Sequence, residues 1–338
     1  MSITTTLPLI FRISDPMTSE HLPMLGPTVQ ASLLEHGRVL LVTMNRPKYL
    51  NAMTDEMEED LAKILDHAES RPSIWVIIIT GSSNPSSVRA FCAGQDLREW
   101  SKKLQSNQQD RLLKNPNGFG SLSRRSSRKP IVAAVDGLCL GGGLELMLNC
   151  DLVVATEQSK FGFPEVTKGT YVAQGGIPRL LQQCGRALAC ELLFLGRPIS
   201  AIEARDRFRI VNQVTTSEDI MSSVLAIARK IILNSPTAVQ LTKLALMDTF
   251  RFDPQLVLRQ EELAKLNALE KDIGIGFERA TVTTILRDEF QDWSHGRNLK
   301  EGIQSFIEKR SAVWTDPPSP KTTLNRSAQS LRNLKSKI

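Results

Sequence analysis

"KPIVAAVDGLCLGGGLELMLNCD" (129–151) places three consecutive glycines between two apolar segments. Residues 131–135 predict a short buried strand and residues 144–150 predict a helix, so the glycines fall where that helix begins. The first N–H groups of a helix have no partner within it, and the helix dipole is positive at this end. Because glycine lacks a side chain, a ligand oxygen can approach such an N–H closely. Either an oxygen-binding turn or tight packing of the helix against the strand explains the run.

A second turn of small residues lies in "AFCAGQDL" (90–97), after the β-branched strand that we predict at 74–80. Two such turns can each supply one backbone N–H to the same oxygen atom. Donors that converge on a developing negative charge form an oxyanion hole, and loss of one donor typically costs about 3 kcal/mol of barrier. The second turn therefore favours an enzyme site over simple packing.

Two glutamates accompany these turns. Glu145 lies in the first helical turn after the glycines, and Glu165 follows in "KFGFPE" (160–165). Taken singly, a glutamate in a first turn usually complements the helix dipole, and one after a proline is usually a surface residue. Beside two oxyanion-type turns, the two together predict a general acid–base pair.

The periodicity of the chain alternates between strand-like and helix-like segments. Residues 54–68 carry apolar side chains at helical spacing, with Thr54 as the expected N-cap. This alternation predicts an α/β fold, and the final third becomes mostly helical. We predict the remaining strands at 38–45 and 151–155 and further helices at 186–195, 219–233 and 236–250.

Composition excludes several classes of protein. No apolar run in the 338 residues approaches the roughly 20 needed to cross a bilayer, so we expect no membrane insertion. The net charge is +6, but the last 22 residues hold five basic and no acidic residues, which leaves about +1 for the rest and argues against a nucleic-acid partner. The five cysteines form no C-x-x-C pair and predict reduced, mostly buried thiols, while four scattered histidines predict no metal site.

The sequence predicts four regions along the chain. We expect an N-terminal extension at 1–27, a core at 28–250 and a helical C-terminal region at 251–316. Residues 317–338 are Pro-rich and then polar and basic, which predicts a disordered tail.

Several segments in this order resemble the enoyl-CoA hydratase/isomerase (crotonase) family. The matching segments are "MNRPKYLNAM" (44–53), "AFCAGQDLREW" (90–100), "KPIVAAVDGLCLGGGLEL" (129–146), "CDLVVATEQSKFGFPEV" (150–166) and "EGIQSFIEKR" (301–310). The resemblance covers about residues 37–315. It implies a crotonase-like spiral of ββα units with a helical C-terminal region, and a homotrimer or homohexamer.

The resemblance also implies roles for the two turns and the two glutamates. The N–H groups of Gln95 and Gly142 would hold the thioester carbonyl of an acyl-CoA. Family members that hydrate carry two carboxylates, as here at Glu145 and Glu165, so we expect reversible hydration of a 2-enoyl-CoA. Glu145 would activate the water and Glu165 would protonate the α-carbon. No cofactor is expected apart from the CoA of the substrate.

The expected CoA contacts follow from the same segments. The adenine and pantetheine would lie along 48–53 and 90–96, and the basic loop 123–129 offers charges for the phosphates. Phe306 and Lys309 lie in a helical end that often reaches toward CoA in this family. The expected binding residues are Lys48, Tyr49, Leu50, Ala93, Gly94, Asp96 and Lys309.

Alternatives stay open at this point. An enoyl-CoA isomerase, other acyl-CoA enolate chemistry, and a non-catalytic binding member of the family each fit part of the pattern. The segments 169–180, 203–214 and 251–290 depart from the family pattern, which leaves the acyl group undecided. The chain ends in Ser336-Lys337-Ile338, one conservative change from the peroxisomal signal S-K-L, so we expect a peroxisomal import receptor as a partner, with mitochondrion or cytoplasm as alternatives.

Overall fold

The fold is taken from a computed structural model, which describes residues 21–84, 88–105, 115–250 and 288–318. Its main sheet has six strands in the order β1-β2-β3-β5-β7-β10. β1 pairs antiparallel with β2, and the other neighbours are parallel. These strands are β1 Val29–Leu34, β2 Val39–Met44, β3 Val76–Gly81, β5 Ile131–Val135, β7 Leu152–Thr156 and β10 Gln213–Thr215.

A second sheet of four short strands lies beside the first, in the order β4-β6-β8-β9. These strands are β4 Ala90–Cys92, β6 Leu138–Leu140, β8 Lys160–Gly162 and β9 Ile199–Ser200. Each long strand β3, β5 and β7 is followed by a short strand of the second sheet and then by a helix. This is the repeated ββα unit that the family resemblance implied.

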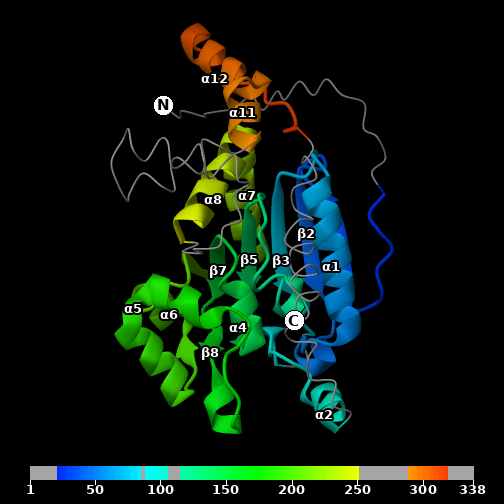
Figure 1. Cartoon of the computed structure of the whole chain (residues 1–338), viewed down its shortest axis with the longest axis vertical. Helices are drawn as coiled ribbons and strands as arrows, with labels where there is room; N and C mark the ends of the chain where they lie inside the picture. The colour runs from blue at the N-terminus through cyan, green and yellow to red at the C-terminus, as the bar shows by residue number, and fades with distance from the viewer. Residues whose placement is uncertain (1–20, 85–87, 106–114, 251–287, 319–338) are drawn as a thin grey trace, which may run out of the picture.

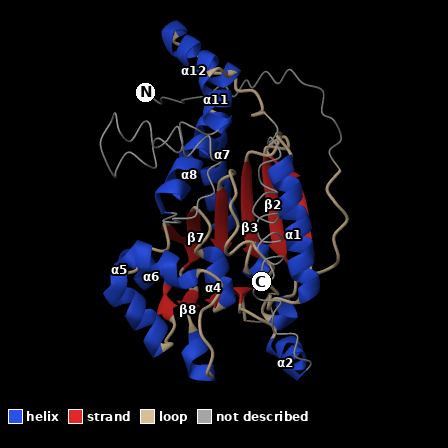
Figure 2. Cartoon of the chain, viewed as in Figure 1, coloured by secondary structure: helices blue, strands red, loops and turns tan. Residues whose placement is uncertain are grey.

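Helices pack on both faces of the main sheet, and further helices lie beyond both ends of its strands (Figures 1 and 2). Figure 1 shows α11 and α12 at the upper end and α2 and β8 at the lower end. The helices are α1 Asp55–Ser70, α2 Leu97–Gln105, α4 Gly142–Met147, α5 Gly176–Leu195, α6 Ala201–Asp206, α7 Ile220–Ile232, α8 Pro236–Phe250, α11 Asp288–Ser294 and α12 Arg297–Glu308. The described residues also form the 3₁₀ turns η1 Pro47–Tyr49, η2 Phe119–Ser121 and η3 Pro164–Lys168.

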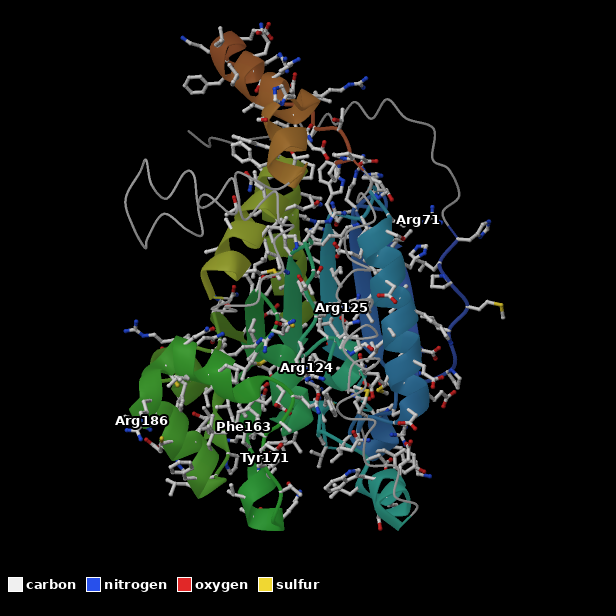
Figure 3. The ribbon with its side chains drawn as sticks, viewed as in Figure 1. Arg71, Arg124, Arg125, Phe163, Tyr171 and Arg186 are labelled. Atoms are coloured by element: carbon white, nitrogen blue, oxygen red, sulfur yellow. The ribbon has the colours of Figure 1, made fainter. Side chains whose placement is uncertain are left out.

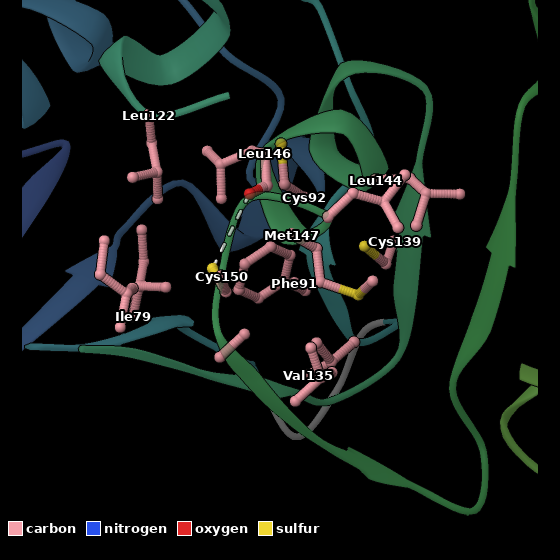
Figure 4. Close-up of a cluster of buried hydrophobic side chains, with 14 of the residues drawn as sticks. Ile79, Phe91, Cys92, Leu122, Val135, Cys139, Leu144, Leu146, Met147 and Cys150 are labelled. Carbon is pink, nitrogen blue, oxygen red and sulfur yellow. Dashed lines mark hydrogen bonds between the residues drawn. The ribbon is translucent and has the colours of Figure 1, made fainter. Parts of the chain in front are cut away.

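Alternate residues of the central strands enter two different hydrophobic clusters. Ile77 and Ile79 of β3 pack with α1, whereas Val76 and Ile78 pack with α7. A parallel sheet with both faces buried requires apolar residues at consecutive positions, as in "IWVIIIT" (74–80). The larger cluster continues beneath α4 (Figure 4), where Phe91, Cys92, Cys139, Met147 and Cys150 are buried.

Most of the elements expected from the sequence are present. Thr54 caps α1, since its side chain accepts a hydrogen bond of 3.3 Å from the N–H of Met57. The helix expected at 186–195 is longer, because α5 begins at Gly176 and is interrupted at Gly185, whose φ is 76°. A glycine with positive φ breaks the helical pattern, so only the second part shows it in the sequence. All five cysteines are free, and three are buried.

The triple glycine is required by the packing of the two sheets. A side chain on Gly143 would collide with the carbonyl group of Cys92 at the end of β4. A Cβ on Gly142 would lie 2.6 Å from the ring of Phe119. The helix α4 can therefore start directly against the turn after β4 only because its first residues have no side chains.

Three of the four basic side chains in the loop 123–129 bind other parts of the chain instead of facing solvent as we expected. Arg125, Arg128 and Lys129 are buried. Arg125 pairs with Asp66 at 2.7 Å, Arg128 pairs with Glu69 at 3.0 Å, and the Lys129 ammonium donates to backbone carbonyls at the end of α1. These cations close the C-terminus of α1, where carbonyl groups lack partners.

The structure describes only parts of the expected N-terminal extension and C-terminal region, and almost none of the expected tail. Residues 21–28 contain no helix and no strand, and residues 1–20 and 319–338 lie outside the described residues. Most of the segment 251–290 lies outside them as well. Within the described part of the chain, no helix is long and apolar enough to cross a membrane, and no cluster of three or more metal-ligating side chains occurs.

Candidate functional site

The two glycine turns lie against each other at the boundary between the sheets. Gly94 has a φ of 95°, and a Cβ built on it would lie 3.5 Å from the backbone nitrogen of Gly142. The same Cβ would lie 3.1 Å from the carbonyl oxygen of Leu140. The turn after β4 and the start of α4 are therefore neighbours, although they are about 48 residues apart in sequence.

The direction of each amide is set by the carbonyl on the other side of its peptide. The peptide before Gln95 is trans, and the carbonyl of Gly94 accepts a 2.8 Å hydrogen bond from the N–H of Met53. In a trans peptide the N–H points opposite to the C=O, so the N–H of Gln95 points away from Met53. Among the described residues it meets no acceptor.

The amide of Gly142 is oriented by the same rule. The carbonyl of Gly141 accepts hydrogen bonds from Leu144 and Glu145 inside α4, at 2.9 and 3.0 Å. The N–H of Gly142 therefore points away from the helix, and as the first helical residue it has no acceptor within α4. No described residue accepts a hydrogen bond from it.

Glu145 is buried beside these amides and is held through one oxygen. Its Oε1 accepts 2.7 and 3.0 Å hydrogen bonds from the backbone N–H groups of Gln174 and Gly176, and 3% of the residue is exposed. A Cβ on Gly176 would lie 2.9 Å from Cγ of Glu145 and 3.0 Å from the ring of Phe163. The glycine that begins α5 thus allows the carboxylate to lie in an apolar and closely packed place.

Glu165 reaches the same place from η3. A Cβ on Gly141 would lie 2.9 Å from its Oε1, so the carboxylate lies over the start of the triple glycine. Its Oε2 is buried and has no hydrogen-bond partner among the described residues. A buried carboxylate oxygen without a partner is costly, which indicates an atom kept available for a ligand.

The surroundings raise the pKa of both carboxyl groups. Burial, with a smaller contribution from the nearby charge of Glu165, raises the pKa of Glu145 to about 7 against the opposing effect of the two backbone amides. Burial also raises the pKa of Glu165, while Lys168 lowers it in part. Two adjacent carboxyls with raised pKa values in a buried place are characteristic of proton-transfer sites.

Five of the expected CoA-binding residues lie together near the two amides. The N–H of Ala93 donates to the carbonyl of Leu50 at 3.0 Å, which joins the segment 48–53 to the loop of Gly94. Lys48 and Tyr49 are exposed on η1 at the edge of this junction.

Asp96 and Lys309 are placed differently from the other expected contacts. The carboxylate of Asp96 pairs with Arg46 at 3.1 Å. Lys309 follows α12, at the end of the molecule opposite α2 and β8 (Figure 1). The segment just after it is fixed to the beginnings of β2 and β3, where Asp316 contacts Arg38 and Trp75. Within one chain, Lys309 is therefore not brought to the amides.

The sequence did not point to two features of this site. The backbone donors of Gln174 and Gly176 to Glu145 were missed, although the pair Gly175-Gly176 was a visible signal. Arg46 was missed because its partner Asp96 lies 50 residues later in the sequence. Figure 3 shows Phe163, Arg124 and Tyr171 in the same lower region, and the charge of Arg124 opposes the rise in the pKa of Glu145.

Comparisons with known proteins show the family to which the chain belongs. Residues 35–273 match the family model described as enoyl-CoA hydratase/isomerase. A mevalonyl-coenzyme A hydratase of Beauveria bassiana is 35% identical over 82% of this chain and 91% of its own length. A short-chain-enoyl-CoA hydratase of Clostridium acetobutylicum is 33% identical over 82% of this chain and 94% of its own.

Solved structures show the same fold. An enoyl-CoA hydratase from Mycobacterium marinum superposes with a TM-score of 0.68 at 29% identity, over 86% of this chain and 99% of that one. An enoyl-CoA hydratase from Bacillus anthracis gives a TM-score of 0.67 at 26% identity, over 85% and 98%. The family model covers well over half of the chain and the fold is that of crotonases, so this chain belongs to the enoyl-CoA hydratase/isomerase family.

Proposed function

We propose that the protein catalyses the reversible addition of water to a 2-enoyl-CoA, which gives a 3-hydroxyacyl-CoA. The observation that carries this proposal is a pair of carboxyl groups, buried Glu145 and half-buried Glu165, beside two outward-pointing backbone amides. Hydration needs a base for the water and an acid for the α-carbon, together with a stabilised enolate between the two steps.

The amides of Gln95 and Gly142 form the proposed oxyanion hole. When hydroxide adds to the β-carbon, the π electrons move toward the thioester and negative charge grows on its oxygen. Donors fixed in advance on that oxygen bind the enolate-like transition state more tightly than the substrate. The oriented peptides of both turns support this role, because they need no rearrangement when the charge develops.

The two carboxyls divide the protons in this proposal. Glu145 accepts a proton from the attacking water, whose oxygen bonds to the β-carbon. Glu165, in its protonated form, donates a proton to the α-carbon of the enolate. The pKa of about 7 for Glu145 suits a group that gains and loses a proton near neutral pH.

The names of the relatives indicate the class of acyl group and not its identity. Relatives are named for mevalonyl-CoA, for 2,3-dehydroadipyl-CoA and for short-chain enoyl-CoA. We therefore propose a short acyl chain, with the CoA moiety along Lys48, Tyr49, Leu50, Ala93 and Gly94. A contact from Lys309 would require a neighbouring copy of the chain. A panel of enoyl- and hydroxyacyl-CoA thioesters that includes mevalonyl-CoA identifies the acyl group and the preferred direction.

Enoyl-CoA isomerisation is the second candidate. It moves a proton between two carbons of the same enolate, for which a single carboxyl is sufficient. The site contains a second carboxyl group besides that of Glu165, because Glu145 is held in place by two backbone donors. The presence of two carboxyl groups favours hydration. A non-catalytic binding role would leave both carboxyl groups without a function to offset their partial or full desolvation.

We predict that Glu145→Gln and Glu165→Gln each lower kcat for hydration by about 100-fold or more, because each removes one proton-transfer group. The measurement is the loss of absorbance of the conjugated enoyl thioester. Glu157→Gln, at an exposed position, is the matched control and should keep wild-type activity. Hydration that survives in Glu145→Gln would contradict the two-carboxyl mechanism, and a retained double-bond shift would favour the isomerase.

We predict that the stability of the wild-type protein has a pH dependence that Glu145→Gln removes. The pKa of Glu145 rises from 4.5 to about 7 on folding, so between these values the folded state holds a proton that the unfolded chain has released. The free energy of unfolding then falls as pH rises through this window, by an amount on the order of 2–3 kcal/mol. Chemical denaturation of both variants from pH 4.5 to 7.5 should show Glu145→Gln gaining relative stability, and parallel curves would refute the burial effect.

The homotrimer or homohexamer implied by the family stays a prediction, and we propose that α8 and α12 contribute to it. Leu246, Ile303, Phe306 and Ile307 are each more than half exposed on these helices in the single chain. Sedimentation should give three or six times the chain mass, and Phe306→Asp should lower this mass without loss of helical circular dichroism. A monomer at micromolar concentration would rule out the assembly.

The peroxisomal address also stays a prediction, since Ser336-Lys337-Ile338 lies outside the described residues. A fluorescent protein fused to the N-terminus of the full chain should collect in peroxisomes and become diffuse when the tripeptide is deleted. Deletion without effect, or a mitochondrial signal, would reject the tripeptide as the address.

A further inference from the structure

The orientation of the Gln95 amide depends on a neighbouring segment rather than on its own secondary structure. Residues 93–96 lie between β4 and α2, and they are fastened to the segment 50–53. Ala93 and Asp96 donate backbone hydrogen bonds to Leu50 and Met53 at 3.0 and 2.9 Å. Met53 donates to Gly94 at 2.8 Å, and this is the bond that turns the N–H of Gln95 outward.

The supporting segment is itself unusual and needs support. Leu50 and Asn51 are consecutive non-glycine residues with φ of 53° and 52°. This left-handed conformation costs roughly 1–2 kcal/mol per residue in an L-amino acid chain. The side chain of Asn51 is fully buried, accepts from the N–H of Arg46 at 2.8 Å, and donates to carbonyls of Ser82 and Ala90 at 2.9 and 2.7 Å.

Arg46 joins the two segments through its side chain. One guanidinium nitrogen donates to the carbonyl of Ala52, and the other pairs with Asp96 at 3.1 Å. The second oxygen of Asp96 accepts from the N–H groups of Arg98 and Glu99 at the start of α2, at 3.1 and 3.3 Å. The side chains of Arg46 and Asp96 are each 15% exposed, so the pair is shielded from solvent.

We propose that Arg46 and Asp96 are positioning residues that fix the peptide before Gln95, and that neither contacts CoA. This inference rests on the proposed function, because it gives the amide of Gln95 its role in the oxyanion hole. The pair lies across the segment that carries this amide, with Ala52 on one side and the start of α2 on the other. Loss of the pair frees the 50–53 segment, and the Gly94 carbonyl then loses its fixed donor.

The test is the separation of kcat from KM. Arg46→Gln and Asp96→Asn should each lower kcat by about 10- to 100-fold with KM changed less than about threefold. A misdirected N–H group stabilises the transition state less, whereas it affects substrate binding little. Asn at position 96 can still accept from α2, so this variant removes the ion pair and keeps the cap. The double variant should lose little more than either single variant, since the two residues act as one unit.

Two further variants guard against an effect of folding alone. Arg89→Gln removes a more exposed ion pair, between Arg89 and Asp136 at 2.8 Å, that involves neither Ala52 nor Asp96, and should leave kcat within about twofold. Arg46→Lys keeps the charge but cannot reach both Ala52 and Asp96, so it should recover only part of the loss. A raised KM with unchanged kcat, or no change in well-folded variants, would overturn the positioning role.

A second readout separates this inference from the hydratase proposal. The carbonyl stretch of a ¹³C-labelled saturated acyl-CoA shifts to lower frequency when two N–H groups bind the oxygen, and no hydration is needed. We expect this shift in wild type and a smaller shift in Arg46→Gln. If wild type shifts the carbonyl but does not hydrate, only the proposed reaction fails. If wild type gives no shift, or if Arg46→Gln gives the full shift, the positioning inference fails.

Discussion

The site depends on the direct approach of two backbones, the turn after β4 and the first residues of α4. Gly94, Gly142 and Gly143 have no side chains at the points where the two turns meet, and a Cβ at Gly143 would collide with the end of β4. Because these turns belong to successive ββα units, their contact also joins the units. The same glycines therefore serve packing and the candidate site, and the two explanations of the triple glycine do not exclude each other.

The carboxyl groups of Glu145 and Glu165 lower the stability of the folded state at the same place. Desolvation disfavours the charged form of both carboxyl groups, and the charge of Glu165 further disfavours the charged form of Glu145. Two backbone amides offset the cost at Glu145, whereas Oε2 of Glu165 has no partner among the described residues. A structure selected for stability alone would not keep this pair, which is consistent with its retention for proton transfer.

The sequence predicted the local features well and the long-range ones poorly. The strand 131–135 and the helix 236–250 coincide with β5 and α8, because apolar periodicity within one element is visible locally. The strands β4, β6, β8 and β9 have only two or three residues, too few to show alternation. Arg125, Arg128 and Lys129 resembled a solvent-facing basic loop, since their partners at the end of α1 lie about 60 residues earlier.

Catalysis and acyl specificity are therefore separable in this chain. In the proposed mechanism the amides and carboxyls act on the thioester, the α-carbon and the β-carbon, which every 2-enoyl-CoA possesses. This accounts for relatives that are named for quite different acyl groups and share about a third of the aligned residues. The acyl chain beyond the β-carbon must meet other residues. The segment 169–180 departs from the family pattern and contributes the backbone donors to Glu145 through Gln174 and Gly176. Changes there can alter the acyl group that is accepted, provided that these two N–H groups keep their direction.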